Sequence, residues 1–205
     1  MRFTVTPLCP SLRRWLPALS AVWLLAGCAT NPVTGESDYV LMSEQQEVAL
    51  GQRFNRQILK EMPPYEDAKL NDLVQSIGEQ LAAHSHRKGL DYSFTIVDSP
   101  TVNAFALPGG YIYITRGIMA HINNEAELAG VVGHEIGHVT ARHGANQMSK
   151  QQLFQVGLGV GLATSEYFRD FAGLATTGLE LMFLKFSRDD ERQADDLGLR
   201  YLVRG

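Results

Sequence analysis

The stretch ELAGVVGHEIGHVTARH, residues 127–143, decides both the fold and the chemistry expected of this chain. His134 and His138 are four residues apart, so on a helix they lie one above the other on one face. Two imidazoles placed in this way can bind one Zn²⁺ at about 2.0–2.1 Å. Glu135 lies one step further round the helix, where its carboxylate can take a proton from a metal-activated water. The alternative is a helix with two solvated histidines, which the apolar residues around the motif disfavour.

A catalytic zinc usually has three protein ligands and one open position, so a third ligand is needed. The longer H-E-x-x-H-x-x-G-x-x-H pattern fails because Ala141 and Gly144 occupy its last two fixed positions, which argues against a metzincin. Downstream, Glu191 and Asp195 share a helix face at i, i+4 spacing in the run SRDDERQAD, residues 187–195. One of them can bind the metal while the other orients a ligating imidazole. The alternative for this run is a solvated helix N-terminus, where acidic residues are favourable anyway.

The other histidines are expected to lie outside the metal site. His143 is five residues past His138, about 140° round a continuous helix, which places it at the surface or in a layer behind the ligands. His84 and His86 lie in a polar run and are expected to be solvated.

Helices on either side of a small group of strands predict an α+β fold. A capping box of Ser43 and Gln46 predicts a helix to about residue 60, and apolar spacing predicts another over 66–83. Asn124 is the expected N-cap of the H-E-x-x-H helix, which should run to about residue 147. Strands are expected at 92–97, 103–107 and 111–115, close helix packing at the glycine-rich segment 153–163, and a last helix from about 187 to the chain end.

Composition limits the classes of protein that remain. The 205 residues are 45% hydrophobic and 20% charged, enough for one domain with a core and hardly enough for two. The net charge of −4 and the absence of a basic stripe argue against a nucleic-acid partner. Two cysteines exclude a disulfide-rich scaffold.

The N-terminus has the features of an export signal. Arg13 and Arg14 precede the uncharged stretch 15–27, which is too short to span a membrane and has the length of a signal-peptide core. Its end, LAGC at 25–28, resembles the lipobox of bacterial lipoproteins. We therefore expect a signal peptide over 1–27 and a tether over 28–42 that is lipidated at Cys28, the alternative being an ordinary secretory signal. Ala29 in place of Asp resembles an outer-membrane address.

Several blocks of the sequence carry a family resemblance: NPVTG at 31–35, SEQQEVALG at 43–51, NAFALPGGYIYITRGI at 103–118, and the two motif stretches at 127–143 and 187–198. They resemble metallopeptidase family forty-eight, a family of gluzincins that includes the CAAX prenyl endopeptidases. The match is best to its periplasmic lipoprotein branch near the β-barrel assembly-enhancing proteases.

The resemblance implies a zincin-like metallopeptidase domain over 43–205, mostly helical with a small mixed sheet. It implies one Zn²⁺ per chain, with Glu135 as the general base and Asp195 as a supporting residue behind the ligands. The three implied zinc ligands are His134, His138 and Glu191. The segment Asn103, Ala104 and Phe105 resembles an edge strand that pairs with substrate backbone, a mode that suits extended peptides.

We therefore expect a zinc-dependent endopeptidase of the bacterial cell envelope, anchored by lipid to the outer membrane and facing the periplasm. Its partners would be unfolded or misassembled envelope proteins and, through the lipid, the membrane. The alternative from another class is a non-proteolytic, zinc-stabilised chaperone or assembly module for outer-membrane proteins, which would not need Glu135. Family members usually continue past the last motif helix, so a C-terminally truncated, inactive fragment is a third alternative.

Overall fold

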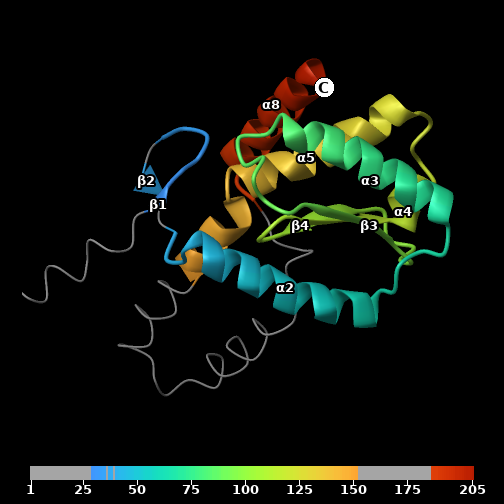
Figure 1. Cartoon of the computed structure of the whole chain (residues 1–205), viewed down its shortest axis with the longest axis horizontal. Helices are drawn as coiled ribbons and strands as arrows, with labels where there is room; N and C mark the ends of the chain where they lie inside the picture. The colour runs from blue at the N-terminus through green and yellow to red at the C-terminus, as the bar shows by residue number, and fades with distance from the viewer. Residues whose placement is uncertain (1–28, 36, 39, 152–185) are drawn as a thin grey trace, which may run out of the picture.

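The computed structural model describes residues 29–151, apart from 36 and 39, and residues 186–205 (Figure 1). The predicted signal peptide, Cys28 and the glycine-rich segment 153–163 lie outside these residues. The described part is α+β, as predicted: helix α2 covers one face of a three-stranded sheet, and α3 and α5 cover the other (Figure 1).

Helices α2 and α3 begin where capping side chains are available. Helix α2 (Glu44–Glu61) starts with the predicted capping box, in which the Ser43 side chain accepts from the Gln46 amide and Gln46 bonds back to Ser43. Helix α3 (Ala68–Ala83) is capped by Asp67, whose carboxylate accepts from the Leu70 amide. Both helices agree with the ranges predicted from the sequence.

The sheet has the order β3-β5-β4 and is mixed, as predicted. Strand β3 (Ser93–Val97) pairs in parallel with β5 (Tyr111–Thr115), and β4 (Ala104–Leu107) pairs antiparallel with β5. Alternation along the strands sends one set of side chains toward α3 and α5 and the other toward α2. The turn between β4 and β5 is made by Gly109 and Gly110, whose φ values of +84° and +95° suit glycine. Strand β4 therefore forms one edge of the sheet, next to α5.

Helix α5 (Glu125–Thr140) follows the short helix α4 (Arg116–Met119) and carries the H-E-x-x-H motif. Its N-cap is Asn124, as predicted. The prediction that this helix continues to about residue 147 is wrong. Arg142 has a φ of +59°, which breaks the helix before residues 143–151 become helical again.

Helix α8 (Arg188–Arg204) begins at a second capping box, formed by Ser187 and Asp190, and lies against α5. The two backbones approach closely at small residues. A Cβ added at Gly137 would lie 2.6 Å from the Ala194 carbonyl oxygen, and one at Gly198 would lie 2.8 Å from the Gly133 carbonyl carbon. This close approach brings the acidic start of α8 to the histidines of α5.

The predicted tether is attached to the domain for part of its length. Strands β1 (Ala29–Thr30) and β2 (Ser37–Asp38) form a short antiparallel ribbon. Val40 is buried, and the Leu41 amide donates to the Ser149 hydroxyl. Among the described residues, no helix has both the length and the apolar character needed to cross a membrane.

Candidate metal centre

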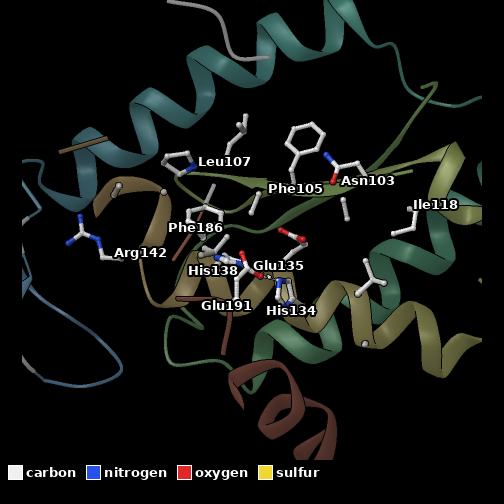
Figure 2. Close-up of a pocket in the computed structure, with 18 of the residues that line it drawn as sticks. Asn103, Phe105, Leu107, Ile118, His134, Glu135, His138, Arg142, Phe186 and Glu191 are labelled. Atoms are coloured by element: carbon white, nitrogen blue, oxygen red, sulfur yellow. Dashed lines mark hydrogen bonds and ion pairs between the residues drawn. The ribbon is translucent and has the colours of Figure 1, made fainter. Parts of the chain in front are cut away.

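A cleft of about 520 Å³ lies between α5 and the edge strand β4. The motif residues of α5 line one wall, and residues 103–107 line the other (Figure 2). Glu191 of α8 and Phe186 also line the cleft near the motif. The size is typical of sites that hold a small ligand or a segment of peptide.

Three side chains from two helices converge in this cleft (Figure 2). Nε2 of His134 and Nε2 of His138 lie 3.0 Å apart. The Glu191 carboxylate oxygens lie 3.4 Å from the first of these nitrogens and 3.9 Å from the second. The structure therefore brings together the residues that the sequence analysis selected as a ligand set.

The geometry and the chemistry of this set fit a divalent metal ion. Ligand atoms bound at about 2.0–2.1 Å to a tetrahedral ion are about 3.3 Å from one another, close to the spacing of these nitrogens and the nearer carboxylate oxygen. Burial, with contributions from His134 and His143, lowers the pKa of His138 to about 3, so this ring is neutral at pH 7. Neutral imidazoles and a carboxylate are common zinc ligands.

Asp195 lies behind His134, where the sequence analysis expected a supporting residue. Its carboxylate Oδ1 is 2.8 Å from Nδ1 of His134. A carboxylate accepts, so the hydrogen-bonded Nδ1 carries the proton and Nε2 presents a lone pair to the cleft. Both side chains are accessible, with 26% of His134 and 74% of Asp195 exposed.

His143 lies behind His138, in the layer behind the proposed ligands and not at the surface. Its Nδ1 is 2.9 Å from Nδ1 of His138, and its Nε2 is 2.8 Å from Oε1 of Gln193. The ring of Phe186 stacks on His138 with centroids 4.3 Å apart. Sequence reasoning missed Gln193 and Phe186.

Glu135 points from α5 into the cleft (Figure 2). Its side chain is buried, and burial raises the pKa of its carboxyl to about 7, partly opposed by His134 and aided by Glu191. A carboxyl group in this position can exchange a proton with a molecule bound in the cleft.

At every second residue of strand β4, the backbone N–H and C=O groups point toward the cleft. The Asn103 carbonyl accepts from the Thr115 amide, which turns the backbone groups of Asn103 and, by antiparallel alternation, those of Phe105 toward β5. The ring of Phe105 stacks on Tyr113 beneath the sheet. The N–H and C=O groups of Ala104 and Ala106 therefore point to the outer edge, where no strand in the described part of the chain pairs with β4.

Comparisons with known proteins find similar peptidases. Residues 68–205 match peptidase family M48. The β-barrel assembly-enhancing protease of Yersinia pestis is 32% identical over 181 residues, which cover 84% of this chain and 37% of that protein. The same protease of Escherichia coli is 32% identical over 85% of the chain and 38% of its own length.

A further relative comes from a eukaryote. The mitochondrial metalloendopeptidase OMA1 of Arabidopsis thaliana is 38% identical over 124 residues, which cover 60% of this chain and 24% of that protein. The chain thus spans little more than a third of the curated bacterial relatives that it matches. These matches confirm the family resemblance seen in the sequence.

Proposed function

The chain belongs to peptidase family M48, and from that premise we propose that it is a zinc-dependent endopeptidase of the bacterial cell envelope. The observation that carries the proposal is the meeting of His134, His138 and Glu191 at one point of a cleft, with Glu135 beside them. The matched relatives are bacterial proteases and a mitochondrial metalloendopeptidase by name, which supports a peptidase activity.

His134, His138 and Glu191 would hold one Zn²⁺ per chain. When bound, the ion would supply Lewis-acid polarisation of a peptide carbonyl and lower the pKa of water. Asp195 would keep Nε2 of His134 directed at the ion through its bond to Nδ1.

Glu135 would act as the general base. Its carboxylate would accept the proton of the attacking water and then give it to the amine that leaves. Its place one residue after His134, inside the same cleft, supports this role, since proton transfer requires contact with the reacting groups.

The segment Asn103, Ala104 and Phe105 would form the substrate-binding edge. The outward backbone groups of Ala104 and Ala106 would bond an extended peptide, while Asn103 and Phe105 hold the strand in the sheet. Extended binding requires an unfolded segment, so unfolded or misassembled proteins are the proposed substrates. The β-barrel assembly-enhancing relatives support an envelope role.

The proposed location follows from the N-terminal sequence. Lipidation at Cys28 after removal of residues 1–27 would anchor the protein in the outer membrane, facing the periplasm. One acyl chain gives only weak membrane binding, so stable anchoring needs the several chains of a lipoprotein.

The test is zinc content and casein hydrolysis of the purified protein, compared between wild type and Glu135→Gln. We expect one zinc per chain in both proteins, and chelator-sensitive cleavage only in the wild type. Glu125→Gln is the matched control, because Glu125 is exposed in the first turn of the same helix and should keep full activity. Zinc binding with cleavage that does not depend on Glu135 would contradict the mechanism. Zinc binding without any cleavage would favour the chaperone or assembly module.

A further inference from the structure

We propose that His143 and Gln193 are positioning residues, which set the tautomer and orientation of His138 so that its Nε2 faces the metal. The inference rests on the proposed function, because it takes His138 to be a metal ligand. It assigns a role to two residues that the H-E-x-x-H motif and the acidic run of α8 do not include.

The three side chains form a continuous chain of hydrogen bonds between α5 and α8. His143 lies between the other two, with Nδ1 2.9 Å from Nδ1 of His138 and Nε2 2.8 Å from Oε1 of Gln193. The imidazoles of His138 and His143 meet edge to face, with centroids 5.0 Å apart. Three of the four ring nitrogens of His138 and His143 therefore face another residue of this hydrogen-bonded series, and Nε2 of His138 does not.

The direction of these hydrogen bonds is set by Gln193, at the end of the series away from His138. An amide oxygen only accepts, so Nε2 of His143 donates to Gln193. In a neutral ring the other nitrogen then accepts, so Nδ1 of His138 must donate to Nδ1 of His143. His138 is left with a lone pair on Nε2, which is the form that binds a metal. Asp190, whose Oδ1 is 3.7 Å from Nε2 of His143, is also an acceptor and favours the same direction.

Burial makes these hydrogen bonds favour one tautomer of His138. His138 and His143 are 4% and 5% exposed, and Phe186 covers the His138 ring. Bonds in such surroundings compete little with water, so a ring in the wrong tautomer would leave a buried nitrogen unsatisfied.

The helix break after α5 places His143 next to His138. On a continuous helix His143 would lie about 140° away from His138. The positive φ of Arg142 turns the chain, and its guanidinium is held by Glu47 and by the Met42 carbonyl. Contacts outside the metal site thus direct His143 to His138.

The first test measures the zinc dissociation constant of the whole protein by chelator competition. We expect His143→Leu to weaken zinc binding by about 10- to 100-fold, the range found for residues that orient metal ligands. His143→Asn, whose amide can still accept from His138, should recover most of the loss. His121→Leu is the control, since His121 is exposed and should bind zinc as the wild type does.

Gln193 gives a second pair of variants that does not alter a buried ring. Gln193→Glu keeps an acceptor and should bind zinc within about threefold of wild type, whereas Gln193→Leu should weaken binding by about tenfold. Unchanged affinity in both His143→Leu and Gln193→Leu would overturn the inference. If His143→Leu does not fold, the Gln193 pair alone decides.

A spectroscopic measurement separates positioning from a general loss of structure. In the zinc-loaded wild type, the Nδ1 proton of His138 should give a downfield resonance that exchanges slowly with water. The resonance should broaden or vanish in Gln193→Leu and persist in Gln193→Glu, and its persistence in Gln193→Leu would overturn the inference. A wild type that binds no zinc would contradict the proposed function before any variant is compared.

Discussion

On its α8 side, helix α5 packs backbone against backbone, whereas at its C-terminal end it is held by buried charged side chains. The glycine seam, made of Gly133, Gly137, Ala194 and Gly198, leaves no room for a side chain at Gly137 or Gly198. At the other end, the carboxylate of Glu47 on α2 bonds both Arg87 and Arg142, and Arg87 also bonds a carbonyl of α5.

The difference between these two contacts lies in what each one controls. The seam sets the separation of α5 and α8, and with it the distance from Glu191 to the histidines. The buried charged cluster of Glu47, Arg87 and Arg142 stabilises the fold and the break after α5. Changes to the seam should therefore alter metal binding first, and changes to the cluster should alter stability first.

The largest effect is expected in the cluster. Glu47 is 1% exposed. Glu47→Ala leaves the buried Arg142 without its carboxylate and Arg87 with only the exposed Glu44, and should cost about 3–5 kcal/mol of unfolding free energy. Urea unfolding measures this loss. Glu44→Ala is the control, because Glu44 is 66% exposed and its ion pair should contribute less than about 1 kcal/mol. Equal losses in the two variants would contradict the assigned role of the cluster.

The seam should be sensitive to a single methyl group. A Cβ at Gly198 would lie 2.8 Å from the Gly133 carbonyl carbon and 2.9 Å from the His134 amide nitrogen, and backbone atoms cannot move aside locally. Gly198→Ala should therefore cost about 1–3 kcal/mol and weaken zinc binding, measured by urea unfolding and chelator competition. A stable variant with unchanged zinc affinity would show that the seam does not set the ligand distance.

A substitution at Asp195 tests the proposed metal site without adding atoms between α5 and α8. Asp195→Ala removes the acceptor behind His134 and should weaken zinc binding by about 10- to 100-fold, with little change in stability because the side chain is 74% exposed. Asp196→Ala, at the exposed neighbouring position of α8, is the matched control for chelator competition. The same zinc affinity in both variants would remove Asp195 from the site.

The smallest effect is expected at Gly130, one turn before the motif on α5. A Cβ there meets nothing within 4 Å, so Gly130→Ala should only improve helix propensity, by about 0.5–1 kcal/mol. Thermal unfolding of Gly130→Ala and Gly198→Ala compares the same substitution at a position without close neighbours and at a position in the seam. A loss of stability at Gly130 as large as the loss at Gly198 would contradict the idea that close backbone approach is what makes the seam sensitive.

Local signals in the sequence predict the parts of this fold that are built from neighbouring residues. Ser43 and Asn124 predict their helix starts because a cap bonds within three residues. The i, i+4 spacings of α5 and α8 likewise predict which side chains share a face.

The parts that were not predicted depend on residues far apart in the chain. The helix break at Arg142 is tied to Glu47, which lies 95 positions earlier, and the position of His143 depends on that break. The glycines of the seam are visible in the sequence, but a glycine does not reveal which backbone will approach it.

The most direct test of the account is the zinc stoichiometry of wild type and Glu191→Gln, with Asp189→Asn as a control at a 91% exposed position of the same turn. If the seam brings α8 to the histidines to complete a metal site, the wild type and the control should each bind one zinc per chain, and Glu191→Gln should lose it at the same free zinc concentration. Full zinc binding by Glu191→Gln would contradict the account, because the metal would then be held without α8.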